Sequence, residues 1–208
     1  MMQLLLKIEA ISFSYRNPLF LTSSPSLFLP PPTSIYGLIA AILGIGNNDV
    51  KENRKIIRKE IQEKIKKLEI YLQDLKADRF EFGILRWNAD KNKRRLKKSW
   101  TTTVTQSYIF NFTFFVKLYC DDSFGKILRK KVDRSESTFT PYLGSSENLI
   151  KSISIVDEKE IDFSNFYKLK EIEEVKEIKE GEIITLLQLP SGYDENGVWR
   201  MKKFAIIK

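Results

Sequence analysis

A proline run followed by an almost wholly apolar segment is the feature that most constrains how this chain folds. The Pro30–Pro32 run cannot lie inside a helix, but it stiffens the approach to one. Thr33 or Ser34 is then a good N-cap, and Gly44 is a strong stop. Residues 34–43 are therefore predicted to form a short helix that is apolar on nearly every side, and such a helix has to be buried.

Strands are predicted on both sides of this helix. Alternating or continuously apolar residues indicate strands over Gln3–Ser14, Phe80–Trp87, Tyr108–Tyr119, Ile153–Ile161, Glu182–Leu189 and Val198–Ile207. The last two are separated by a turn rich in Gly, Asp and Asn, so residues 182–207 are expected to pair as a hairpin.

Two further helices are predicted, and two segments stay ambiguous. Asp49–Lys67 repeats isoleucines at helical spacing between charges, and Asp121–Ser123 can cap a short helix that runs to Val132. Lys67–Leu75 extends the first of these helices or forms a strand, and we favour the strand. Lys168–Glu180 alternates in charge and reads as a helix or an exposed linker.

Taken in order, these elements give strand, helix, strand, strand, helix, strand. That order is the split βαβ pattern of a ferredoxin-like domain, so we expect an α+β fold. We assign residues 1–161 to this domain, with an insertion at about 80–107. Residues 162–208 are expected to form a C-terminal extension with a β-hairpin, packed on the same domain. The fold alone decides no function.

The chain has 208 residues, no histidine and one cysteine, Cys120. The missing histidines remove the commonest general base, the imidazole metal ligand and every Ser-His or Cys-His site. Ordinary zinc sites are excluded for the same reason. A single cysteine cannot form an intramolecular disulfide, which favours a reducing compartment. We therefore expect no catalytic histidine site, no metal and no cofactor.

The charge of the chain points to an acidic partner. The formal net charge is +8 and the pI is about 9.4, and nucleic acid is the commonest partner of such proteins. The sharpest local feature is the segment Asn88–Ser99, which has one acid, Asp90, and six cations: Lys91, Lys93, Arg94, Arg95, Lys97 and Lys98. Trp87 and Trp100 flank it and can stack on bases.

The N-terminus has charges at Lys7 and Glu9 and no small-residue cleavage site, so it does not read as a signal peptide. The longest apolar stretch, Ile35–Ile45, is shorter than the ~20 residues that a membrane helix needs. We expect a soluble, cytoplasmic protein that does not contact a membrane.

Two segments carry a resemblance to a known family. Phe28–Gly44 (FLPPPTSIYGLIAAILG) resembles the run that opens the first helix of the Cas-five family, the RAMP-superfamily subunits of type I CRISPR complexes. Thr140–Glu147 (TPYLGSSE) is similar to that family's late loop. The order and spacing of both segments fit, and the resemblance covers most of the chain.

The resemblance implies a ferredoxin-like, RRM-like RAMP domain with a β-hairpin thumb inserted between its second and third strands. It further implies a non-catalytic subunit that caps the 5′ handle of the CRISPR RNA and nucleates a Cascade surveillance complex in antiviral defence. The implied protein partners are the backbone subunit of the Cas-seven family and the large subunit, and target DNA is met only through the complex. The basic run falls where the thumb is expected.

Two explanations stay open for the presence of Gly37 inside the predicted helix. Glycine inside a helix costs ~1 kcal/mol relative to alanine. Either its bare backbone lets RNA approach the start of the helix, whose NH groups favour phosphate, or the helix packs closely on the sheet there. For Tyr142 and Gly144 the alternatives are a handle contact or a turn. Tyr15 and Arg16 are candidates for stacking and phosphate contact. The complete set of RNA-binding candidates is Tyr15, Arg16, Thr33, Ser34, Tyr36, Gly37, Trp87, Lys91, Lys93, Arg94, Arg95, Lys97, Lys98, Trp100, Thr101, Tyr142 and Gly144.

Two other functions compete with the cap. One is a CRISPR RNA-processing endoribonuclease of the same superfamily, whose histidine-dependent site has no counterpart in this sequence. The other is a scaffold subunit whose basic hairpin docks on an acidic protein surface instead of RNA.

Overall fold

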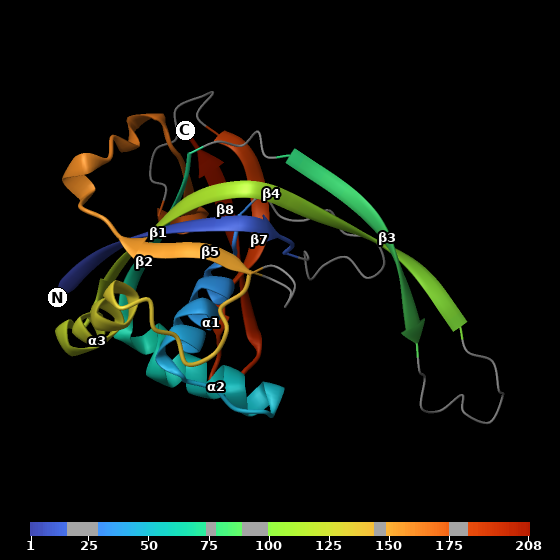
Figure 1. Cartoon of the computed structure of the whole chain (residues 1–208), viewed down its shortest axis with the longest axis horizontal. Coiled ribbons are helices and arrows are strands. Elements are labelled where there is room, and N and C mark those ends of the chain that lie inside the picture. The colour runs from blue at the N-terminus through green and yellow to red at the C-terminus, as the bar shows by residue number, and fades with distance from the viewer. Residues whose placement is uncertain (16–28, 74–77, 89–99, 144–148, 175–182) are drawn as a thin grey trace.

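The apolar helix that follows the proline run is α1, Pro32–Leu43, and it lies against one face of a curled antiparallel sheet (Figure 1). The computed structural model describes residues 1–15, 29–73, 78–88, 100–143, 149–174 and 183–208. The strands are β1 Met2–Phe13, β2 Ile65–Leu72, β3 Asp78–Asn88, β4 Trp100–Cys120, β5 Ile150–Ile155, β6 Tyr167–Glu171, β7 Ile183–Tyr193 and β8 Trp199–Ile207. The other helices are α2 Val50–Glu60, α3 Asp122–Asp133 and the single turns η1 Gln62–Lys64, η3 Glu158–Glu160, η4 Phe163–Asn165 and η5 Ile172–Glu174.

The strand order of the sheet is β5-β1-β4-β2-β6-β8-β7, and β3 pairs with β4 off this path. The part β5-β1-β4-β2, with α1 and α3 on the same face, has the strand order of a ferredoxin-like domain. In that domain the second and fourth strands along the chain are the outer two of the four, as β2 and β5 are here. The predicted α+β class is confirmed. β6, β8 and β7 widen the same sheet beyond β2.

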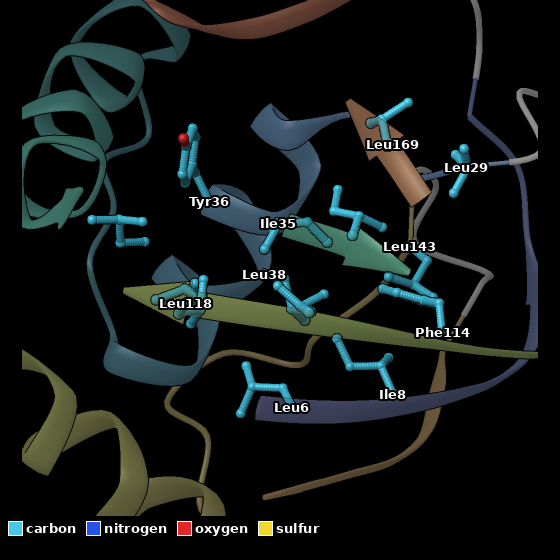
Figure 2. Close-up of a cluster of buried hydrophobic side chains, with 14 of the residues drawn as sticks. Leu6, Ile8, Leu29, Ile35, Tyr36, Leu38, Phe114, Leu118, Leu143 and Leu169 are labelled. Carbon is cyan, nitrogen blue, oxygen red and sulfur yellow. The ribbon is translucent and has the colours of Figure 1, made fainter. Parts of the chain in front are cut away.

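The core forms where α1 meets the sheet. Alternation along β1 and β4 points Leu6, Ile8, Phe114 and Leu118 at the helix. Figure 2 shows Ile35 and Leu38 of α1 reaching down to these side chains. All of them are buried, which accounts for the apolar composition of α1.

The long strand β4 serves two parts of the molecule. From Ile109 to Cys120 it pairs with β1, and from Phe114 to Cys120 also with β2. From Trp100 to Phe110 it pairs with β3, and this two-stranded ribbon projects away from the helices (Figure 1). Residues 89–99, which join the two strands of the ribbon, lie outside the described residues.

The start of α1 differs from the prediction. Pro31, not Thr33 or Ser34, is the N-cap, and it makes no side-chain capping bond. Pro32 occupies the first helical turn, where proline's missing N–H costs nothing and its fixed φ suits a helix. Thr33 and Ser34 therefore lie inside the first turn.

Of the two ambiguous segments, one prediction is confirmed and one is wrong. The helix expected over Asp49–Lys67 ends at Glu60, and the strand favoured for Lys67–Leu75 is β2, Ile65–Leu72. Lys168–Glu180 is predicted to be a helix or an exposed linker, yet 167–171 is β6, with Leu169 buried; residues 175–180 lie outside the described residues. At β6, pairing with β2 and β8 overrides the local pattern.

A buried carboxylate ties β6 to β2 on the sheet face that α1 does not cover. Glu69 is 7% exposed; Lys168 Nζ lies 2.6 Å from its Oε1, and the Tyr71 hydroxyl donates to its Oε2 at 2.9 Å. Burial alone would raise the pKa of Glu69, but the hydrogen bonds from Lys168, Lys67 and Tyr71 outweigh burial and hold it at about 2.

Changing Glu69 to Gln should lower the free energy of unfolding by about 2–3 kcal/mol at pH 7, because the variant loses a carboxylate whose pKa is depressed on folding. That contribution is complete above the ordinary pKa of 4.5 and disappears as the pH falls towards 2. The difference between the wild type and E69Q should therefore shrink over this window. Urea titrations from pH 2 to 7 measure it, with the exposed Glu195→Gln as control. A difference that stays constant with pH would contradict the assigned pKa.

Gly44 should tolerate no side chain. It ends α1 with φ +74, and a Cβ there would lie 2.7 Å from Thr138 Oγ1. Gly44→Ala should cost about 1–3 kcal/mol of stability, because the left-handed backbone and the contact both oppose a Cβ. Gly46→Ala, where the nearest atom would be 3.4 Å away, is the matched control and should change stability little. Thermal melts of both variants measure this, and equal losses would refute the explanation.

Candidate functional site

A hollow of about 480 Å³ lies beside the N-terminal half of α1. We call it the α1 hollow. Four of the predicted RNA-binding residues line it: Thr33, Ser34, Gly37 and Tyr142. Gly37 belongs to the proline-run segment and Tyr142 to the late-loop segment, about a hundred residues further on. The fold therefore brings both sequence motifs to one place.

Local hydrogen bonds position the walls of the hollow. Asp49 caps α2 by accepting from the backbone N–H groups of Lys51 and Glu52 at 2.9 Å, and Asn53 Oδ1 accepts from Asn47 N at 2.9 Å. Phe139 N donates to Ala41 O at 3.0 Å, which holds the 139–142 segment against the end of α1. These bonds fix the loops on two sides of the hollow.

The β7–β8 turn supplies a third wall. Asp194 Oδ1 accepts from Asn196 N at 2.9 Å and from Val198 N at 2.8 Å, so the turn is closed by one side chain. Trp199 follows at once, and the guanidinium of Arg54 lies 4.7 Å from the centre of its ring. A cation held over the ring orients the indole before any ligand arrives.

The hollow is lined by aromatic side chains that are open to solvent. Phe139 is 52% exposed, Tyr142 49% and Trp199 41%. Flat aromatic faces of this kind stack on splayed bases at ~1–3 kcal/mol each. The sequence analysis did not identify Phe139 or Trp199 as candidate binding residues. For Trp199, the sequence offers one indication, an aromatic residue just after the Gly/Asp/Asn turn.

The environment of Gly37 rules out one of its two explanations. A Cβ built on Gly37 meets no heavy atom within 4 Å, so close helix–sheet packing does not account for this glycine. The side chains that pack on the sheet are Ile35 and Ile39, both fully buried. Gly37 instead leaves a stretch of bare helix backbone at the wall of the hollow.

Two predicted tyrosines lie in the core. Tyr15 is 4% exposed, with its ring 5.5 Å from that of Phe13, and burial raises its pKa. A ring so enclosed has no face for a base, so the predicted stacking role of Tyr15 is excluded. Tyr36 is 7% exposed and lies outside the α1 hollow; burial, then the charge of Glu171, raises its pKa to about 12.

The remaining predicted residues belong to the ribbon or lie outside the described residues. Trp87 pairs with Thr101 and Asn88 with Trp100 at the far end of the β3–β4 ribbon. The ribbon end is well separated from α1 in Figure 1, so the predicted residues form two groups and not one cluster. The predicted RNA-binding residues that lie outside the described residues are Arg16, Lys91, Lys93, Arg94, Arg95, Lys97, Lys98 and Gly144.

A tyrosine and a lysine lie together on the sheet face that α1 does not cover. Lys168 Nζ donates to the Tyr71 hydroxyl at 3.0 Å, and that hydroxyl donates to Glu69. Burial, and then the hydrogen bond to Glu69, raise the pKa of Tyr71. The phenol therefore holds its proton, which is the opposite of what a general base requires. Among the described residues, no cluster of acidic and cysteine side chains is arranged to hold a metal ion.

The helices that the structure describes are all too short or too polar to cross a membrane.

Comparison with solved structures shows the fold. A chain of a solved CRISPR RNA-guided surveillance complex is similar, with a TM-score of 0.63 and 13% identity; the match covers 99% of this chain and 88% of that one. A solved Cas protein gives a TM-score of 0.56 and 12% identity, with 100% of this chain and 96% of that one covered.

Comparison with sequences shows the family. No curated protein matched this chain. A family model described as CRISPR-associated protein (Cas_Cas5) matches residues 3–204, which is nearly the whole chain. The resemblance of the two motifs is thereby confirmed, and the chain belongs to the CRISPR-associated Cas-five family.

Proposed function

We propose that this chain binds CRISPR RNA without cutting it and caps the 5′ handle of the guide RNA in a type I Cascade surveillance complex. One observation carries the proposal: two motifs distant in sequence, represented by Gly37 and Tyr142, line the same hollow. That hollow offers bare backbone near the start of a helix together with exposed aromatic rings.

The chemistry of the hollow suits single-stranded RNA. Gly37 lets a sugar–phosphate chain come close to the backbone of α1. Phe139, Tyr142 and Trp199 offer faces for unstacked bases. A volume of about 480 Å³ has room for one or two nucleotides at most, so the hollow would hold a short, defined part of the handle.

The ribbon supplies the second contact. Its connecting segment carries six cations in eight positions, Lys91 to Lys98. Phosphate neutralisation by these cations releases condensed counterions and gives affinity that does not depend on sequence. We assign the cations of the connecting segment to phosphates along the RNA, and the α1 hollow to a short stretch of backbone at Gly37 together with its bases.

The proposed place in the complex rests on the family and the fold. The similar chain of the surveillance complex has the same fold over 99% of this chain. We therefore propose the Cascade backbone subunit and large subunit as protein partners, and contact with target DNA only through the complex.

The proposal excludes catalysis on chemical grounds. The chain contains no histidine, and in a tyrosine–lysine–carboxylate group of the described sheet, Tyr71, Lys168 and Glu69, the pKa of the tyrosine is raised. This group therefore supplies no phenolate base for attack by the ribose 2′ hydroxyl.

Removing the ribbon cations should weaken RNA binding and its salt dependence together. In the variant with Lys93, Arg94, Arg95 and Lys97 changed to Ala, the slope of log K against log salt should fall by up to about 3, since each single-strand phosphate contact contributes ~0.7. Filter binding of a CRISPR repeat RNA across a salt series measures this. The control removes four exposed cations of α3 and its end: Lys126, Arg129, Lys130 and Arg134.

RNA from the same tubes, run on a denaturing gel with a chelator present, should stay intact. Cleaved RNA would overturn the non-catalytic proposal. Equal losses in the two four-cation variants would show that the ribbon binds by net charge alone.

Gly37→Ala should separate stability from binding. The added methyl meets open space, so stability should stay equal or rise by up to about 1 kcal/mol, as for alanine in place of glycine within a helix. RNA affinity should fall by about tenfold, because a Cβ keeps the phosphate chain away from the helix. Since no charge changes, the salt slope should be unaltered. Thermal melts measure the stability, and the same binding assay measures the RNA affinity. An unchanged affinity would show that the α1 hollow is not part of the RNA-binding site.

A further inference from the structure

The walls of the α1 hollow carry no charge. They consist of apolar, aromatic, hydroxyl and amide side chains, and no Asp, Glu, Lys or Arg of the described residues is among them. A neutral site gains nothing from counterion release, so stacking and hydrogen bonds decide what it binds. Its amides come from three asparagines at and before the start of α2: Asn47, Asn48 and Asn53.

Two of these amides are held in one orientation. Asn53 Oδ1 accepts from Asn47 N at 2.9 Å, and Asn47 Oδ1 accepts from Asp49 N at 2.9 Å. A backbone N–H can bond only to the oxygen of an amide side chain, so these bonds turn both oxygens to the backbone. Within the described ranges, neither Nδ2 donates to a protein acceptor. Each amide therefore keeps its N–H donors for a ligand.

Asn53 lies beside an aromatic ring of the same hollow. Gly46 lies between the two side chains: a Cβ built on it would be 3.4 Å from Asn53 Oδ1 and 3.7 Å from Phe139 Cε2. Asn53 is half-buried and Phe139 is 52% exposed, so the ring offers a face while the amide is held next to it. A base that stacks on Phe139 therefore has one edge beside Asn53.

N–H donors at that edge discriminate between bases. Uracil and guanine carry a ring carbonyl, O4 or O6, where cytosine and adenine carry an amino group, N4 or N6. The carbonyl accepts from an asparagine amino group. An amino group in its place would set donor against donor and leave both without a bond, which costs most where water is partly excluded.

We propose that the α1 hollow selects a keto base, uracil or guanine, and that Asn53, with Asn47 next to it, determines this selectivity. The inference rests on the proposed RNA function and adds to it the kind of base that the hollow takes. Stacking on Phe139 is open to every base, since every base has a flat face. Donation by Asn53 is satisfied only by a base with a carbonyl at the position of uracil O4 or guanine O6.

Two pairs of RNA probes isolate this difference. Tetranucleotides of uridine and cytidine form one pair, and tetranucleotides of inosine and adenosine form the other. Within each pair the ring size and the phosphate charge are equal, and only the carbonyl or amino group and the proton on the neighbouring ring nitrogen change. We expect the keto member of each pair to bind about tenfold more tightly.

The measurement is an NMR titration of the ¹⁵N-labelled full chain to millimolar probe. The side-chain signals of Asn47 and of the Trp199 indole give the affinity, and both residues line the hollow. The Asn53 side-chain signal, assigned by its loss in Asn53→Asp, should shift with the uridine and inosine probes.

Asn53→Asp replaces the donors with an acceptor and keeps the backbone bond, because a carboxylate also accepts from Asn47 N. The keto-to-amino affinity ratio should fall to about one or below. The added negative charge weakens the members of a pair alike, so the ratio reports the selectivity. Asn165→Asp is the matched control: it is exposed on η4, whose Phe163 packs on Tyr71 at the face that α1 does not cover, and it should keep the wild-type ratio.

The inference is overturned by equal affinities within both pairs, by tighter binding of cytidine or adenosine, or by an Asn53 signal that no probe shifts. A wild-type ratio in Asn53→Asp would overturn it as well, since the selectivity would then arise elsewhere. The proposed function is judged separately, by binding of the CRISPR repeat RNA. A chain that binds the repeat RNA and treats both members of each pair equally keeps the function and loses the inference, and a chain that binds neither kind of RNA loses both.

Discussion

The backbone pairing of β4 is the interaction on which the rest of the structure depends. One half of this strand hydrogen-bonds to β1 and β2 and carries Phe114, Val116 and Leu118 into the core under α1. The other half pairs with β3 and forms the projecting ribbon. Because a single continuous strand belongs to both, the ribbon is attached to the most buried part of the molecule.

α1 divides the functional surface of the body into two sides. Its buried residues, such as Ile35 and Ile39, fix it on the sheet. On one side, Gly37 opens the helix backbone to the α1 hollow. On the other, Tyr36 lines a groove of about 640 Å³ between β2 and β8. One buried helix therefore separates the hollow from this groove.

One buried group of charges in the body joins two strands of the sheet. Where a lysine, a tyrosine and a carboxylate come together, at Lys168, Tyr71 and Glu69, their mutual bonds keep the glutamate charged and the tyrosine protonated. Such a group ties strands together and has no spare base. Among the described residues, Lys170 and Arg200 have no ion-pair partner, and both line the groove between β2 and β8.

The sequence by itself determined the parts of the fold whose signals are local. The proline run and the apolar residues up to Gly44 predict α1, and alternation predicts β1 and most of β4, because a buried face imposes its period on the residues that form it. The position of Gly37 within a helix and the cations from Lys91 to Lys98 could likewise be read directly. Only the tertiary structure decided the rest. β6 contains one buried leucine, Leu169, and its residues show no alternation of apolar and polar side chains that would predict a strand. It is a strand because it pairs with β2 on one side and β8 on the other. Tyr15 is enclosed by Phe13 and its neighbours, and Phe139 and Trp199 meet Gly37 across one hollow, through contacts between residues far apart in the chain. Such contacts leave no pattern along the sequence, since the free energy that makes them comes from packing and pairing across the whole fold.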